Sequence, residues 1–179
     1  MSTNLQFIKE ENITTASANI QFDNFFDTEE YDKYCIIYSG FYKTVVSDSS
    51  LRLIDNSGST ISGTEYEFAT INLRPASSFT FNKETGATNL RRFFGRPDTE
   101  SSGESSNGVI YVFDPLDSGK FTYFIGLSSY CETGTEIWNK FMGVHKSAER
   151  IRGITIFGNS GHNFTSGKIT LFGVKWVVV

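Results

Sequence analysis

Short segments in which apolar and polar side chains alternate recur along most of the chain. Clear examples are the apolar pairs Leu51 and Leu53, Tyr66 and Phe68, and Phe79 and Phe81. A period of two places such side chains on one face of a β-strand, whereas an amphipathic helix requires spacings of three and four residues. Clusters of Gly, Ser, Asn and Asp, such as NSGST at 56–60, separate the segments and predict turns. The pattern therefore predicts an all-β chain.

Further strands are predicted on either side of these segments. The run YCIIYSGF at 34–41 is apolar almost throughout, which is typical of a strand that is covered on both faces. GVIYVFD at 108–114 and FTYFIGLSSYC at 121–131 are joined by PLDSGK, and this arrangement predicts a hairpin. The segments at 151–161 and 167–179 alternate again and close the chain as two more strands.

Two stretches do not follow the alternation. TEIWNKFMGVHKSAER at 135–150 spaces Ile137, Phe141 and Val144 as on one face of a helix. Gly143 counts against a helix there, so a helix, a strand ribbon and a long loop all remain open. RPDTESSGESSNG at 96–108 has no apolar anchor and predicts a mobile loop.

The composition supports a single domain built from sheets. The 179 residues are 39% hydrophobic, which is enough to bury a core without disulfides. They include 17 phenylalanines, and aromatic residues favour strands over helices. With roughly ten short strands and no strand-helix-strand rhythm, the predicted fold is one antiparallel, jelly-roll-like β-sandwich over residues 1–179.

The charge of the chain argues against nucleic acid as a partner. The formal net charge is −4 and the pI is near 5.2, whereas nucleic-acid-binding domains carry a clustered basic face. One basic cluster, LRRFFGRP at 90–97, interleaves three arginines with Phe93 and Phe94. These rings could stack on unpaired bases, but a solvated strand edge is the favoured interpretation.

Neither a leader nor a membrane segment is predicted. The first 22 residues contain no apolar stretch of signal-peptide length, and no run approaches the ~18 apolar residues of a membrane span. We therefore expect a soluble chain that is made in the cytoplasm. In a reducing compartment Cys35 and Cys131 are expected to be buried thiols, with a disulfide between two packed sheets as the alternative.

The sequence GNSG at 158–161 raises the question of a nucleophilic serine. Ser160 is followed by His162, and the only other histidine is His145. In trypsin-like proteases, a remote histidine that a buried aspartate orients activates the serine, and neither histidine here has such a setting. In the α/β-hydrolases, the serine lies in a Gly-x-Ser-x-Gly elbow between a strand and a helix, and this pattern is also absent from the sequence. The segment is therefore interpreted as a turn. No two of the 20 acidic residues can be selected from the sequence as a hydrolytic pair, so the protein is predicted not to be an enzyme.

No metal or cofactor site is predicted. The histidines and cysteines lack the spacing of a zinc set, and no phosphate-binding glycine motif occurs. DTEEYD at 27–32 and DPLD at 114–117 are the calcium candidates, and both are interpreted as surface turns. Exposed aromatic rings could instead stack on sugars. Tyr130, Trp138 and Phe141 lie near loop-like sequence and are the candidate contacts for a glycan or a partner.

Three stretches carry a resemblance to a known family. They are ASANIQFDNFFDTEEYDKYCIIYSGF at 16–41, LRLIDNSGS at 51–59 and HNFTSGKITLFGVK at 162–175. Together they resemble a β-sandwich domain of tailed-bacteriophage virion proteins, especially the tail-fibre and accessory proteins of marine and cyanobacterial phages. The resemblance implies a structural virion component, located in a tail fibre, a tail adaptor or a capsid decoration. Its partners would be other virion proteins and a host surface.

The apolar C-terminal segment predicts a subunit contact. Trp176, Val177, Val178 and Val179 would form an exposed apolar edge on a monomer, which soluble proteins avoid. We therefore expect a homo-oligomer, for which a trimer would be a natural state. A carbohydrate-binding module that recognises surface glycans is the alternative function, and a hydrolase of surface polysaccharide is the third hypothesis.

Overall fold

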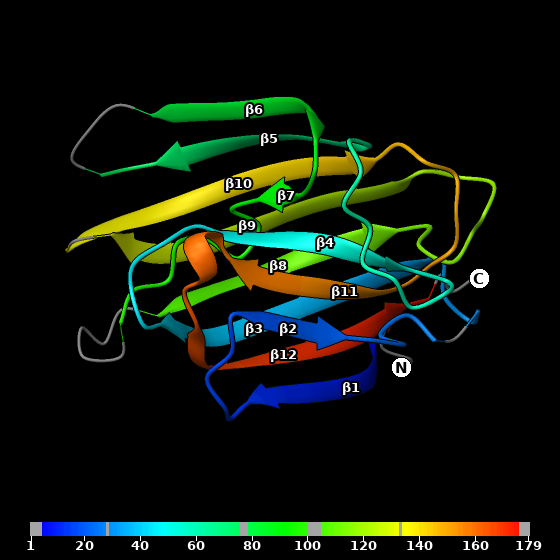
Figure 1. The fold of residues 1–179 in the computed structure, drawn as a ribbon, viewed down its shortest axis with the longest axis horizontal. Coiled ribbons are helices and arrows are strands. Elements are labelled where there is room, and N and C mark those ends of the chain that lie inside the picture. The colour runs from blue at the N-terminus through cyan, green and yellow to red at the C-terminus, as the bar shows by residue number, and fades with distance from the viewer. Residues whose placement is uncertain (1–4, 28, 76–78, 100–104, 133, 176–179) are drawn as a thin grey trace.

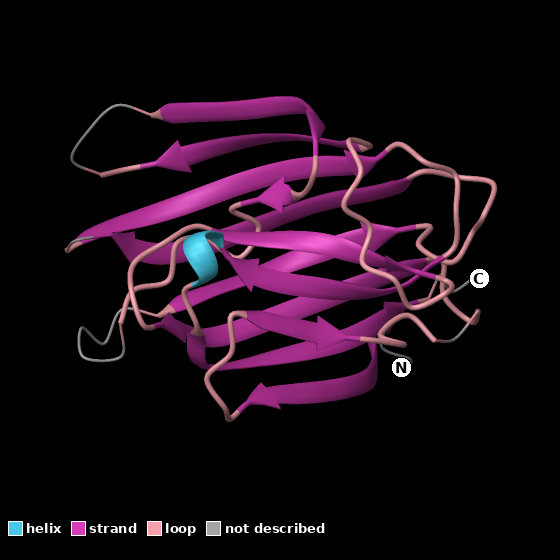
Figure 2. Ribbon diagram, in the orientation of Figure 1, coloured by secondary structure: helices cyan, strands magenta, loops and turns pink. Residues whose placement is uncertain are grey.

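The computed structural model describes residues 5–27, 29–75, 79–99, 105–132 and 134–175. Within them, 12 strands form two antiparallel sheets, and the only helical element is the 3-10 turn η2 (Asn159–Gly161) (Figure 2). The all-β sandwich prediction is therefore confirmed. No helix in these ranges is long and apolar enough to cross a membrane.

The eight strands of the large sheet come from all parts of the chain. In spatial order they are β1 (Leu5–Ile13), β12 (Phe164–Val174), β3 (Lys33–Lys43), β8 (Ser106–Phe113), β9 (Thr122–Glu132), β10 (Thr135–His145), β5 (Tyr66–Leu73) and β6 (Thr80–Ala87). The small sheet contains β2 (Asn19–Phe22), β11 (Ile151–Gly158), β4 (Ser49–Asp55) and β7 (Leu90–Arg91). The small sheet covers one face of the large sheet, and β5 and β6 extend beyond it (Figure 1).

The predicted hairpin and the ambiguous stretch after it are neighbouring strands. β8 and β9 pair antiparallel as expected, and β10 pairs with β9 along its whole length and with β5 from Trp138 to His145. The helical alternative for 135–150 is therefore wrong. Ile137 and Phe141 are four residues apart, a spacing that fits a period of two as well as a helix, and the buried polar Asn139 between them hides the alternation.

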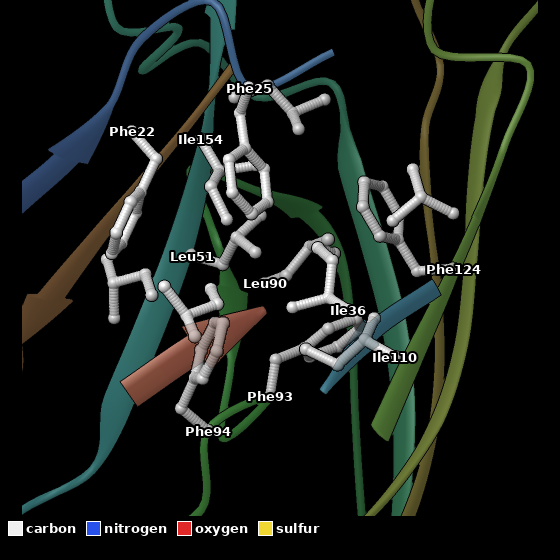
Figure 3. Close-up of a cluster of buried hydrophobic side chains, with 14 of the residues drawn as sticks. Phe22, Phe25, Ile36, Leu51, Leu90, Phe93, Phe94, Ile110, Phe124 and Ile154 are labelled. Atoms are coloured by element: carbon white, nitrogen blue, oxygen red, sulfur yellow. The ribbon is translucent and has the colours of Figure 1, made fainter. Parts of the chain in front are cut away.

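The core between the sheets is mostly aromatic (Figure 3). Its centre includes Phe93 and Phe94, two sequential residues that are both fully buried. Two adjacent residues of a regular strand would point to opposite faces. Here β7 has ended, and the positive φ angles of Arg92 (64°) and Gly95 (67°) turn the chain so that both rings face inward. Phe93 packs on Phe141 with 4.2 Å between ring centroids, and Phe94 stacks on Phe41 at 5.5 Å.

Two further predictions concern the cysteines and the loop at 96–108. Cys35 and Cys131 are buried free thiols, as expected. Of the predicted mobile loop at 96–108, residues 100–104 lie outside the described residues. On its two sides, the Asp98 carbonyl accepts a hydrogen bond from the Lys43 amide at 2.9 Å, and the Ser106 hydroxyl donates to the Phe94 carbonyl at 2.8 Å. The ends of this segment are therefore fixed to the core.

Candidate interaction surface

The large sheet has a second face, turned away from the small sheet, which we call the outer face. Directly paired residues of antiparallel strands point to the same side of a sheet, so the pairing defines which side chains this face presents. The central row crosses all eight strands and consists of Phe7, Phe172, Cys35, Tyr111, Ile125, Met142, Ala69 and Lys83. Seven of these eight side chains carry no charge, and six of the seven are apolar or aromatic.

A mainly apolar row lies on each side of the central row. One row consists of Leu5, Val174, Lys33, Phe113, Tyr123, Val144 and Glu67. The other consists of Glu10, Thr170, Ile37, Val109, Leu127, Lys140, Ile71 and Phe81. Of the five charged members, Glu10 and Lys83 stand on the edge strands, Glu67 stands on β5, and Lys33 and Lys140 stand on the inner strands β3 and β10. The four-residue centre Val109, Tyr111, Ile125 and Leu127 is uncharged.

Ten of the large apolar side chains of this face are exposed to solvent, whereas Cys35 in the central row is buried. Leu5, Phe7, Ile37, Phe81, Tyr111, Tyr123, Ile125, Leu127, Trp138 and Met142 all belong to this face and are among the exposed large hydrophobic residues. An antiparallel sheet with one solvated face normally alternates apolar inward with polar outward residues. Monomeric soluble proteins rarely expose contiguous apolar patches above ~600 Å². The outer face is therefore the strongest candidate for an interaction surface.

Two shallow hollows lie in this face. The first, of about 420 Å³, is lined by residues of β5, β6, β9 and β10, including Tyr123, Ile125 and Met142. The second, of about 540 Å³, lies around Leu127 and Trp138. Both hollows are open and mainly apolar, which suits a protruding side chain of a partner better than a small polar ligand.

The three predicted contact aromatics do not lie on one surface. Trp138 is 49% exposed and belongs to the outer face, beside Leu73 and Ser129. Tyr130 and Phe141 are each 1% exposed and point into the core, so the expectation that they contact a glycan or a partner is corrected. Trp138 and Phe141 are three residues apart on β10, and an odd spacing in a strand places two side chains on opposite faces. The predicted subunit contact at residues 176–179 lies outside the described residues.

The arginine cluster of residues 91–96 surrounds a buried carboxylate. Asp48 pairs with Arg91 at 2.6 Å and with Arg92 at 3.1 Å, and Arg96 contacts both Asp48 and Glu132. Phe93 and Phe94, which could have stacked on bases, are fully buried. The cluster therefore fixes the loop that follows β7 to the start of β4.

A buried lysine lies next to this cluster. The Nζ of Lys43 donates to the Ser47 hydroxyl at 2.6 Å and to the Ser47 and Asp48 carbonyls at 3.2 and 3.1 Å. It also lies 4.9 Å from the centre of the Phe164 ring. Burial lowers the pKa of Lys43 to about 8, and the nearby Asp48 carboxylate opposes this effect. No sequence signal indicates a buried amine here, because a lysine at the end of a strand is typical of the surface.

The other candidate chemical groups occupy turns. Ser160 is exposed in the 3-10 turn η2 with φ 63°, which confirms the interpretation of GNSG as a turn. Asp32 and Asp114, one from each calcium candidate, meet through a 2.7 Å bond from the Asp114 amide to the Asp32 carbonyl. The ammonium group of Lys120 lies 3.0 Å from the Asp114 carboxylate and 3.2 Å from Asp117. A side-chain cation thus already neutralises this acidic group.

His145 gives the fold a predicted pH dependence. Its ring is fully buried against Tyr66, at 4.9 Å between centroids, and neither nitrogen has a hydrogen-bond partner among the described residues. Burial lowers the pKa of His145, while Glu149 at 3.8 Å and Glu65 oppose this effect. The unfolded chain therefore binds a proton near pH 6.5, where the folded chain does not, so the free energy of unfolding falls as pH drops below about 6.5.

The variant His145→Phe keeps a ring against Tyr66 and removes the titrating group. We expect its unfolding free energy, measured with urea between about pH 7 and about pH 5, to fall less steeply than that of the wild type. Parallel pH profiles for the two proteins would show that His145 contributes nothing to the acid sensitivity.

The fold defines the class of this protein as an antiparallel β-sandwich, and none of the described residues covers the outer face of its large sheet. Comparison with models of known protein families, with curated proteins and with solved structures finds no match to this chain.

Proposed function

We propose that this protein is a structural virion component that assembles with protein subunits of the particle through the outer face. The observation that carries the proposal is the mainly apolar surface formed by the three rows across the large sheet. Covering that surface removes apolar area from water, which is the main driving force of protein association. The almost uninterrupted apolar run at 34–41, typical of a strand covered on both faces, supports the same conclusion, because Ile37 of this run is exposed in the isolated chain.

The virion setting is supported by the resemblance to tailed-phage β-sandwich domains. The three stretches that carry it fall on regular elements of the sandwich: 16–41 includes β2 and most of β3, 51–59 includes most of β4, and 162–175 includes β12. They contribute strands to both sheets.

The proposal is tested on purified phage particles that encode the chain. We expect mass spectrometry to find the protein in a fixed copy number per particle, with few copies for a tail location and hundreds for a head location. Particles that lack the protein, although the infected cell contains it, would refute the virion role.

Glycan recognition is a second candidate function because Trp138 is exposed beside polar groups. Ser129 and Lys140 line the same hollow, so a ring for stacking and groups for hydrogen bonds lie together. If this hollow binds sugar, Trp138→Ala should weaken binding at least about tenfold on a glycan array, as expected for the loss of an aromatic anchor. The matched control is Phe81→Ala, another exposed aromatic of the outer face outside this hollow. Equal loss in both variants, or no binding by the wild type, excludes a sugar site at Trp138.

A further inference from the structure

We propose that the outer face binds a second copy of this chain, so that two sandwiches pack face to face about a two-fold axis. This inference deepens the proposed function, since it names the occupant of the docking surface. It rests on two properties of that face, namely its size and its uncharged centre.

The face is large enough for a stable dimer. Eight strands about 4.8 Å apart and three rows about 6.8 Å apart cover roughly 40 by 20 Å when the side chains at the margins are included. This area of about 800 Å² equals what one partner contributes to a standard protein interface. The centre of the face is uncharged, as in the fully buried core of homodimer interfaces.

The hollows lie mainly in one half of the face. Both involve β9 and β10; the first extends over β5 and β6, and the second also reaches Asn107, Gly108 and Val109 of β8. The half formed by β1, β12, β3 and β8 presents the rings of Phe7, Phe172 and Tyr111, the first two in edge contact at 6.1 Å. The other half presents the rings of Tyr123, Trp138 and Phe81. A two-fold axis that runs parallel to the strands between β8 and β9 places the first half of each copy over the second half of the other. Such an isologous contact uses the same patch twice and closes the assembly at two copies.

The same axis places β1 of one copy over β6 of the other, because these strands are the two edges of the sheet. Glu10 on β1 pairs with Lys168 of its own copy at 3.0 Å, so this ion pair stays within each copy at the rim, and Lys83 of β6 lies one row away from it. The axis leaves the strands of the two sheets nearly aligned, which is the common packing of β-sheets, with an angle of about 30°.

The test is the mass of the purified protein in solution, measured by sedimentation or light scattering at tens of micromolar. We expect twice the chain mass of 20.1 kDa for the wild type. Ile125→Asp and, as a second variant, Met142→Lys should each be monomeric, with dimer affinity reduced at least about 100-fold by the buried charge. The control is Val45→Asp: Val45 is 48% exposed, as is Ile125, but it lies in the loop after β3. It should remain dimeric. Circular dichroism establishes that each variant is folded.

Three outcomes would overturn the inference. A wild-type monomer at these concentrations, a trimer, or a dimer that survives both outer-face substitutions is incompatible with the two-fold packing. A wild-type monomer that is nevertheless incorporated into particles, with incorporation lost in Ile125→Asp, would reject the dimer and leave the proposed function standing. Absence from particles together with a face-dependent dimer would reject the virion role alone.

Discussion

Replacing Phe93 by Ala is expected to lower the free energy of unfolding by about 3–5 kcal/mol, the usual cost of deleting a buried aromatic ring. Phe93 is fully buried and packs on Phe141 at 4.2 Å and on Phe124 at 5.9 Å between ring centroids. It therefore joins the loop after β7 to two central strands of the large sheet. The measurement is urea-induced unfolding followed by fluorescence. The slope of the unfolding free energy against urea concentration should be the same for the variant and the wild type.

Phe79→Ala is the matched control, because it is the same substitution at a side chain that is 60% exposed. We expect its effect to remain within about 0.5 kcal/mol. A loss for Phe93→Ala no larger than that of the control would mean that this loop does not hold the two sheets together.

The second large effect is expected from adding a single methyl group at Gly126. This residue lies on β9 below the ring of Phe141, and a Cβ atom there would lie 2.3 Å from Phe141 Cζ and 2.4 Å from the Val109 carbonyl oxygen. The ring can turn, but the carbonyl belongs to the neighbouring strand, so Gly126→Ala must displace β8 relative to β9. We expect a destabilisation of about 3 kcal/mol, at the upper end for overpacking.

Two further variants make this prediction specific. Gly119→Ala, in the exposed turn between β8 and β9, meets only the Asp117 side chain at 3.3 Å and should change stability by no more than about 0.5 kcal/mol. Combining Gly126→Ala with Phe141→Leu should cost less than the sum of the two single changes, because part of the clash is removed. Strict additivity would show that the ring is not what opposes the methyl group.

The strands could be predicted from the sequence because their apolar period of two is a local property. The hairpin of β8 and β9 and the turn at Ser160 followed for the same reason. Phe93 and Phe94 could not be placed from that period, since their burial depends on the positive φ of Arg92 after a two-residue strand. Such a backbone conformation is decided by tertiary packing and the Asp48 ion pairs.

The outer face could not be predicted from alternation alone, because a period of two separates the two sides of a strand without telling which side is covered. Along β9, Phe124 and Ile125 are both apolar, yet only Phe124 is buried. A weaker signal does exist. In the run at 34–41, apolar residues occupy both odd and even positions, which indicates that both faces of the strand are apolar. The period of two, applied to 135–145, also assigns Trp138 and Phe141 to opposite faces, because their spacing is odd.

The uncovered sheet face has a consequence for how such a chain must be produced. Until a second copy covers it, every newly folded molecule exposes a hydrophobic sheet surface through which it can aggregate, and this tendency grows with concentration. Because the proposed cover is the same chain, correct pairing and aggregation draw on one pool of molecules. The melting temperature of the pure protein should therefore rise with its own concentration.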